Sequence, residues 1–481
     1  MRKLEVIFLI LFFVLGFIFR LYRFDSPIAD WHSWRQADTS AVSRNFATNG
    51  FDPLHPQFDD LSNVPSGIDN PKGLRFVEFP IYNFFQAFFF KSFGVFTIEE
   101  WGRLVSITAS MLSALFLFLI VKRRFGASAG FLSLVFFLFL PYNIYFSRTI
   151  LPDPSMVMAV LAGIYFFGVA LEKSDKEGFK KWLYFLVSLF FISVSFLIKP
   201  YALFFTLPII YLSFEKYGFA FLKKWQLWVF AVVSVIPLLL WRLWMQSFPE
   251  GIPASNWLFN EGNIRFKGAF FYWLFGERLS KLILGYFGLP LLMLGFLRLH
   301  VKKDLLFLLS FIGASLIYMT VIARGNVQHD YYQILIIPSI SMAMGIGGVF
   351  LTRPLGNINK SVSYLIFLTL TIFSFFFSWY YVRDFFNINN QSILVAGKAV
   401  DRLTPKDAKI VANYNGDTSF LYQTKRKGWA SFQNGLADLI KKGASYLVLV
   451  NPTDTDLGIG TQFKIIEATD QYVIFNLLQK P

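Results

Sequence analysis

The chain contains many separate apolar runs of about 17–25 residues, the length that crosses the ~30 Å hydrocarbon core of a bilayer. Runs this long predict transmembrane helices, because a helix satisfies its backbone polar groups within each segment. Hydrophobic residues make up 55% of the chain and cysteine is absent. The sequence therefore predicts an all-α polytopic membrane protein that is held together by packing rather than by disulfides.

Basic residues concentrate in the short loops between these runs. Such loops lie on the cytoplasmic side by the positive-inside rule. The net charge of +15 thus indicates topology and does not indicate binding to nucleic acid. The basic loops are Arg2-Lys3, Lys122-Arg123-Arg124, 173–181, 216–224, 298–303, and Arg353 with Lys360.

The basic loops also decide which apolar runs span. If the run 77–93 crossed the membrane, Lys122-Arg123-Arg124 and every later basic loop would face outward. We therefore expect 77–93 to form a helix in the membrane interface, and the uncleaved first run to be a retained span. About eleven spans remain, at 4–22, 103–121, 127–146, 154–171, 182–198, 201–214, 228–246, 284–299, 305–322, 333–351 and 362–382.

This topology divides the chain into two predicted domains. Residues 1–385 form the transmembrane part, with a first external loop at 23–102 that carries interfacial helices. After residue 386 the apolar runs shorten, which predicts a small extracytoplasmic α/β domain at 386–481. Its predicted elements are a helix at 392–403, strands at 409–412 and 446–450, and a hairpin from 463–468 and 472–477.

The segment from Trp31 to Thr39 follows the first span and holds an unusual concentration of aromatic and charged side chains. It holds two tryptophans, a histidine, Arg35 and Asp38, whereas a span needs only an aromatic anchor and one charge to leave the bilayer. A carboxylate in such a setting is a candidate reactive group. The structural alternatives are that Asp38 caps a helix at 39–48 and that His32 makes a structural hydrogen bond.

The same external loop and three later ones carry further candidates, which are Glu78, Arg148, Asp153, Lys199, Arg324, His329, Tyr331 and Tyr332. Ionisable residues at a membrane face are functional candidates by default. Each also has a structural alternative. Asp153 can cap a helix, Lys199 can snorkel from a helix end, the arginines can pair with acids, and the tyrosines can belong to the aromatic belt. All of these residues lie on the predicted external side of the membrane, and this shared side favours a functional role over separate structural roles.

The motif Asp454-Thr455-Asp456 has the Asp-x-Asp form that holds a metal and a nucleotide diphosphate in soluble sugar transferases. Here it follows Asn451-Pro452 in a predicted turn on the external side, away from cytoplasmic nucleotides. We therefore interpret it as a turn and expect no metal site and no cofactor.

The order of these motifs resembles the membrane glycosyltransferases with the GT-C fold, in the branch that contains protein O-mannosyltransferases and the aminoarabinose transferase that modifies lipid A. The matching motifs, in order, are an acid after the first span, Glu78-Phe79-Pro80-Ile81-Tyr82, Phe93-Gly94 with Arg103-Leu104, Leu151-Pro152-Asp153-Pro154, Ile198-Lys199-Pro200, and 323–338 with His329-Asp330-Tyr331-Tyr332. Two positions depart from the pattern. Phe79 stands where the aminoarabinose branch has lysine, and 35–38 reads Arg-Gln-Ala-Asp instead of an Asp-Glu pair.

The resemblance implies transfer of a sugar from a polyprenyl-phosphate donor to an envelope lipid, glycan or protein, with inversion, at the external face of the inner (plasma) membrane. Asp38 would be the general base, with Asp30 as second candidate. Trp34 and Arg35 would contact the substrate. Arg324, Lys199, Arg148 and His329 would stabilise the departing phosphate, and Glu78 and Asp153 would orient these cations. The alternatives are a lipid-linked-sugar transporter or an envelope polysaccharide polymerase.

Overall fold

The computed structural model describes residues 3–173, 178–297, 301–353 and 359–481. The chain divides into two compact units, and each collects segments that are distant in sequence. The helical unit comprises Met1–Phe24, Leu104–Trp241 and Ser255–Asp384, and the mixed unit comprises Asp25–Arg103, Arg242–Ala254 and Phe385–Pro481. The first external loop thus groups with the C-terminal segment.

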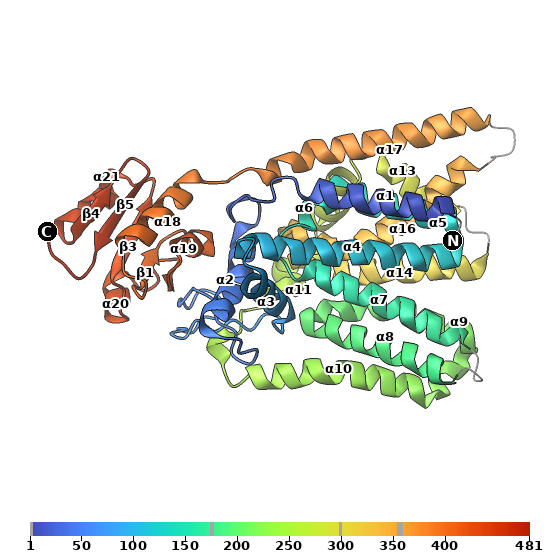
Figure 1. Ribbon diagram of the computed structural model, residues 1–481, viewed down its shortest axis with the longest axis horizontal. Helices are drawn as coiled ribbons and strands as arrows, with labels where there is room; N and C mark the ends of the chain where they lie inside the picture. The colour runs from blue at the N-terminus through green and yellow to red at the C-terminus, as the bar shows by residue number, and fades with distance from the viewer. Residues whose placement is uncertain (1–2, 174–177, 298–300, 354–358) are drawn as a thin grey trace. The chain divides into compact units, whose positions relative to one another are not determined.

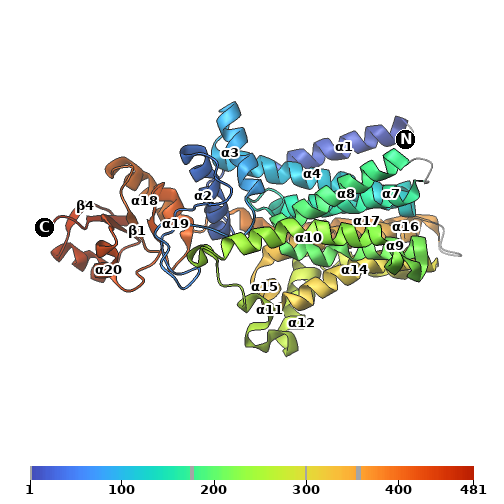
Figure 2. The ribbon, with the colours of Figure 1, turned by 90° about the horizontal axis from the view of Figure 1, so that it is seen from below.

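The helical unit is built from long apolar helices that run along one another (Figure 1). Its elements are α1 (Lys3–Arg20), α4 (Ile98–Phe125), α5 (Ala127–Phe139), α6 (Pro141–Phe146), α7 (Asp153–Glu172), α8 (Gly178–Ile198), η2 (Pro200–Thr206), α9 (Leu207–Tyr217), η3 (Gly218–Lys223), α10 (Trp225–Met245), α11 (Trp257–Asn260), η5 (Glu261–Phe266), α12 (Gly268–Phe271), η6 (Tyr272–Ile283), α13 (Gly288–Leu297), α14 (Lys302–Val321), α15 (Ala323–Gln328), η7 (Asp330–Ile336), α16 (Ile337–Thr352) and α17 (Lys360–Val382). Figure 2 shows α11, α12 and α15 gathered beside one another.

In the described part of the chain, seven helices are long and apolar enough to cross a membrane. An eighth is added if Gly268–Ile283 and Gly288–Leu297, which meet at a bend of 107°, count as one span. The predicted eleven spans include runs that the structure breaks. The run 127–146 divides into α5 and α6, and 201–214 begins as the 3-10 helix η2. The predicted span 284–299 extends into 298–300, which lie outside the described residues, as do Arg2 and 174–177 of the predicted basic loops.

The break between α5 and α6 lies at Pro141, which has no N–H to donate to the preceding turn. Side-chain donors bind the backbone carbonyls that have no partner within the helix at this break. Asn143 Nδ2 donates to the Phe137 carbonyl at 2.6 Å, and Arg20 Nη1 donates to the Leu138 carbonyl at 3.0 Å. Arg20 is fully buried and its Nε also donates to Ser147 Oγ at 2.7 Å. This arginine therefore joins the end of α1 to both sides of the break.

Ion pairs gather at one end of the helical unit. They connect the start of α1 and α14 with the ends of α4, α7 and α9, through Lys122–Glu5, Arg123–Glu172, Arg124–Glu215 and Arg124–Asp304. The start of α7 lies about 30 Å away along its 20-residue axis. The three basic residues Lys122-Arg123-Arg124, predicted in a loop, thus form the last turn of α4, at the end of the bundle opposite the polar start of α7.

The mixed unit contains a five-stranded sheet of order β2-β1-β3-β5-β4. Strands β1 and β3 follow the predicted positions, and β4 and β5 form the predicted antiparallel hairpin. The sequence did not predict β2, α19, α20 or α21. The elements of this unit are α2 (Ser33–Asn49), α3 (Ile81–Phe93), η4 (Pro249–Gly251), η8 (Arg383–Phe386), α18 (Gln391–Leu403), β1 (Ile410–Ala412), α19 (Thr418–Thr424), β2 (Gly428–Trp429), α20 (Leu436–Lys441), β3 (Tyr446–Val450), α21 (Asp454–Leu457), η9 (Gly458–Thr461), β4 (Lys464–Ala468) and β5 (Tyr472–Asn476).

The two faces of this sheet bury different helices. Successive residues of a strand point to opposite faces, so Ile410 and Ala412 pack with α18 and α19, while Val411 packs with Trp429 and with Leu439 of α20. Apolar side chains thus cover both faces, and no disulfide is needed to hold the sheet.

The first external loop extends the sheet beyond β2. Gly428 N donates to the Asp59 carbonyl at 3.0 Å, and Leu61 N donates to the Gly428 carbonyl at 2.7 Å. Leu61 also joins the apolar cluster under this face of the sheet. The loop and the C-terminal segment therefore share one core, which explains why they form one unit.

The predicted interfacial run 77–93 contains α3, which spans only Ile81–Phe93. Its 13 residues extend about 20 Å, less than the ~30 Å core of a bilayer. The rejected Asp-x-Asp motif forms the short helix α21. There the Thr453 hydroxyl and the Asp456 carboxylate cap the helix reciprocally, so this acid serves local structure.

Candidate active site

Helix α2 carries the first candidates. It begins at Ser33, so Asp38 lies inside the helix and does not cap it, and the cap alternative is wrong. Arg35 and Asp38 are three residues apart and project from the same face of α2. The local sequence thus places a cation and a carboxylate side by side in the mixed unit.

The segment that leads into α3 supplies a partner for each of them. Arg75 Nη2 lies 2.6 Å from Asp38 Oδ2, and Arg35 pairs with Glu78. The spacing of Arg75 and Glu78 repeats that of Arg35 and Asp38, so two ion pairs run between the segments. The four side chains are between 4% and 11% exposed. Because buried charges are tolerated when they are paired, each pair fixes the other segment in place.

These charges line a small cavity with a free volume of about 10 Å³, room for about one water molecule. The lining residues are Arg35, Asp38, Thr39, Val42, Pro56, Arg75, Glu78, Pro80 and Asn83. Two carboxylates, two guanidinium groups and an amide in one concave site offer both donors and acceptors, which is the chemistry that orients a polar substrate. This cavity is the candidate active site of the mixed unit.

Other carboxyl groups lie close enough to influence this site. Burial raises the pKa of Asp60 to about 6, and the charge of Asp38 adds to this increase against hydrogen bonds from Ser62. Burial likewise raises the pKa of Asp417, again with a contribution from Asp38. Negative charge is therefore concentrated around Asp38, and Arg75 is the cation that compensates it directly.

Asp30, the second candidate acid, has a different environment. Its side chain is fully buried and accepts a hydrogen bond from Gln36 Nε2 at 2.7 Å. Its neighbour Trp31 stacks on Phe385 with ring centroids 4.9 Å apart. The Trp34 carbonyl lies 3.2 Å from the Thr418 hydroxyl. The start of the segment thus packs within the mixed unit, while Arg35 and Asp38 reach the cavity.

In the helical unit, Asp153 and Lys199 form a buried ion pair. Lys199 Nζ lies 2.6 Å from Asp153 Oδ1, and the two side chains are 8% and 0% exposed. Asp153 makes no capping bond at the start of α7, so the cap alternative is wrong. The Lys199 side chain is also buried, so the alternative that it snorkels from a helix end to the membrane surface is wrong. The rings of Tyr331 and Tyr332 each lie 5.4 Å from Lys199 Nζ, within cation–π range.

Arg148 connects two helix ends of the helical unit. It is 1% exposed, and its Nη1 donates to the Arg23 carbonyl at 2.7 Å. Its guanidinium also lies 5.5 Å from the Tyr145 ring. Together with Arg20, which holds Ser147, it ties the end of α1 to the end of α6. These contacts describe a structural role for Arg148.

The segment 323–336 holds the remaining candidates. His329 stacks on Tyr331 with centroids 5.6 Å apart and meets the Trp257 ring edge-on at 5.7 Å. Arg324 is 37% exposed in its side chain, and its Nε lies 3.9 Å from Glu261 Oε2. That ion pair is long and partly solvated, so it holds the guanidinium weakly.

Sequence reasoning missed several residues that organise these clusters. Arg278 pairs with Asp330 at 2.5 Å from the π-helical segment η6, and the Tyr142 hydroxyl donates to the Asp330 carbonyl at 2.6 Å. Arg75 and Thr418 hold Asp38. One signal was present for Arg75, because its spacing to Glu78 matches that of Arg35 to Asp38. For Arg278 and Thr418 no sequence signal distinguishes them from neighbouring polar residues.

Residues 71–244 match the family described as dolichyl-phosphate-mannose-protein mannosyltransferase. This stretch contains Glu78, Arg148, Asp153 and Lys199. No curated protein sequence matches the chain.

Solved structures extend the likeness to nearly the whole chain. ArnT from Cupriavidus metallidurans bound to undecaprenyl phosphate superimposes with a TM-score of 0.65 at 13% identity, covering 99% of this chain and 98% of that chain. The Archaeoglobus fulgidus oligosaccharyltransferase, in complex with Zn and sulfate, gives a TM-score of 0.58 at 11% identity, covering 94% of this chain and 68% of that chain. At these identities the likeness shows the fold.

The fold is the GT-C fold, as the motif order predicted. The chain is thus a multi-pass membrane protein with the GT-C fold, and residues 71–244 are similar to the mannosyltransferase family. Among the described residues, no group of three or more His, Asp or Glu side chains is arranged to hold a metal ion.

Proposed function

We propose that this chain transfers a sugar from a polyprenyl phosphate to an envelope lipid, glycan or protein, with inversion at the anomeric carbon. The family match to dolichyl-phosphate-mannose-protein mannosyltransferases and the undecaprenyl phosphate bound to ArnT support a lipid-phosphate donor. A donor of this kind needs no nucleotide site, because its phosphate is carried by the lipid.

Asp38 is the proposed general base, and the observation that carries this assignment is its position in the charged cavity of the mixed unit. Its carboxylate borders that cavity together with Arg35, Arg75 and Glu78. Asp30 is fully buried against Gln36 and is not among the residues that line this cavity. A general base must reach the proton that it removes, and Asp38 meets this requirement better.

Lys199 and Arg324 are the proposed ligands of the donor phosphate. The transition state gathers negative charge on the departing phosphate, and fixed cations stabilise such charge. Asp153 holds Lys199 in position, as Glu78 holds Arg35. Among the residues that the structure describes, Arg324 makes one long ion-pair contact, so its guanidinium can turn to a phosphate. Tyr331, Tyr332 and His329 would form the wall beside it.

The reaction is proposed to occur at the extracytoplasmic face. The ion-paired basic residues in the last turn of α4 lie at one end of the helical unit, and Asp153, at the start of α7, pairs at the other end with Lys199, which precedes η2. Since basic loops face the cytoplasm, the polar starts of these helices face outward. The same rule places the C-terminal segment outside.

The decisive experiment compares Asp38→Asn with Asp30→Asn. Each variant is expressed in a strain from which the gene has been deleted, and envelope glycans are measured by mass spectrometry against the parent. We expect Asp38→Asn to lower transfer by about 10²–10⁴-fold, the usual contribution of a general base. Binding of undecaprenyl phosphate to the purified variant should stay unchanged. Near-normal transfer by Asp38→Asn would contradict the assignment of the base.

A further inference from the structure

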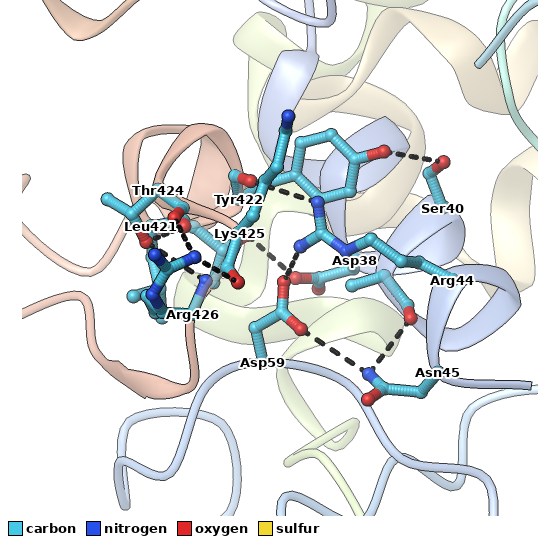
Figure 3. Close-up of polar contacts among 12 residues, drawn as sticks. Asp38, Ser40, Arg44, Asn45, Asp59, Leu421, Tyr422, Thr424, Lys425 and Arg426 are labelled. Carbon is cyan, nitrogen blue, oxygen red and sulfur yellow. Dashed lines mark hydrogen bonds and ion pairs between the residues drawn. The ribbon is translucent and has the colours of Figure 1, made fainter. Parts of the chain in front are cut away.

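The C-terminal segment contributes a helix that packs directly on α2 within the mixed unit. Figure 3 shows α19 side chains meeting those of α2. Arg44 Nη1 donates to the Tyr422 carbonyl at 3.1 Å, and its guanidinium lies 4.1 Å from the centre of the Tyr422 ring. The Tyr422 hydroxyl lies 3.0 Å from Ser40 Oγ and donates to Glu99. Helix α19 is therefore anchored along its length.

At the start of this anchored helix, the Thr418 hydroxyl lies 2.7 Å from Asp38 Oδ1 and 3.2 Å from the Trp34 carbonyl, and its one proton goes to the nearer, charged oxygen. The other oxygen of Asp38 accepts from Arg75 Nη2 at 2.6 Å. Each carboxylate oxygen thus has one donor, and the two donors come from chain segments more than 340 residues apart. A carboxylate offers about four acceptor positions, so positions remain on Asp38 for an incoming proton.

The Thr418 hydroxyl is not needed to begin its own helix. Asp417 caps α19 by accepting from Ser419 N at 2.8 Å. The next hydroxyl along the helix, Ser419 Oγ, is buried and faces Asp417 rather than Asp38. Of two adjacent hydroxyls on one helical turn, the one at 418 therefore meets the carboxylate. Its β-branched side chain has few rotamers, which restricts the direction of the hydroxyl.

We propose that Thr418 is a positioning residue for Asp38, so that the C-terminal segment sets the orientation of the base. This inference rests on the proposed function of Asp38. The hydroxyl and Arg75 each hold one carboxylate oxygen, and two fixed oxygens define the plane of the carboxylate. Loss of the hydroxyl should therefore leave Asp38 less well oriented, while the donor-binding residues are untouched.

The first test needs no substrate. The carboxylate stretching bands of the purified full-length protein are recorded by infrared spectroscopy, and the difference spectrum against Asp38→Asn assigns the band of Asp38. Thr418→Val, which keeps the shape and removes the donor, should shift the frequency of that band, because one carboxylate oxygen loses a hydrogen bond. Thr418→Ser should restore the original frequency. Ser419→Ala is the matched control and should leave the frequency unchanged.

The second test measures transfer by the same variants in the deletion strain. We expect Thr418→Val to reduce transfer about 10-fold, with undecaprenyl phosphate binding unchanged, and Thr418→Ser to stay within about 2-fold. An unshifted Asp38 band in folded Thr418→Val would overturn the positioning role, whatever its activity. Normal transfer by Asp38→Asn, in contrast, would refute the proposed base, and the band shift would still report the hydrogen bond from Thr418.

Discussion

Lys199 Nζ lies 2.6 Å from Asp153 Oδ1, and this buried ion pair joins the start of α7 to the residue that precedes η2. The sequence presented these residues as separate candidates, a helix cap and a snorkelling cation. Their pairing changes both interpretations, because each charge now depends on the other.

We predict that Asp153→Asn destabilises the protein by about 3–5 kcal/mol, since it leaves a buried lysine without its counterion. The double variant Asp153→Asn with Lys199→Met should recover much of this loss, because the buried charge is also removed. Thermal unfolding in detergent measures both. Glu277→Gln, which breaks a more exposed pair with Lys281, is the control and should cost less than about 1 kcal/mol. A milder effect of Asp153→Asn than of this control would argue against a stabilising pair.

Arg324→Ala should weaken binding of undecaprenyl phosphate about 10-fold, because a charge-assisted hydrogen bond to phosphate is lost. Its effect on stability should be small, since its contact with Glu261 is long and partly solvated. Binding to purified protein in detergent provides the measurement. Lys267→Ala removes an exposed cation from the same part of the chain and serves as control. Equal affinity in the two variants would refute a phosphate ligand at 324.

Asp60 should make stability depend on pH. Its folded-state pKa of about 6 lies above its ordinary value of 3.8. Between these values the folded protein binds more protons than the unfolded chain, so stability falls as pH rises through this window. Above about pH 6 the full cost of about 3 kcal/mol is present.

Asp60→Asn removes this cost. The variant should therefore exceed the wild type in stability at about pH 7.5, and the difference should vanish near about pH 4. Thermal unfolding followed by tryptophan fluorescence across this range gives the comparison. Asp69→Asn changes an exposed acid of the same loop and should show no such trend. If the two proteins differed in stability by the same amount at all pH values, the difference would not come from ionisation of Asp60.

The helix α3 should lie at the external membrane surface without crossing the bilayer. The chain has no cysteine, so Ser92→Cys introduces a single reactive thiol at an exposed position. We expect a membrane-impermeant maleimide to label it in intact cells or spheroplasts. Lys216→Cys, in a predicted cytoplasmic loop, should react only after permeabilisation. Labelling of the Ser92→Cys variant only from the cytoplasm would overturn the predicted topology.

Local patterns were sufficient to predict much of the fold. Apolar runs identified the helices, because burial in lipid demands continuous apolar length. In the C-terminal segment, helical spacing identified α18, and short apolar strands identified β1, β3 and the β4–β5 hairpin. The two-residue strand β2 was missed, since Gly428-Trp429 carries no periodicity and owes its extended form to pairing with β1.

The candidate site, like the fold, was predicted only in part from the sequence. By itself the sequence determined the class of protein, the order of its motifs and the acids and cations worth considering, because residue type and hydrophobic length are local properties. Only the tertiary structure decided which of them share a cavity. Arg75 and Thr418 meet Asp38 across 37 and 380 residues of chain, and Lys199 meets Asp153 across 46. Such partners are selected by packing of distant segments, and no local pattern records them.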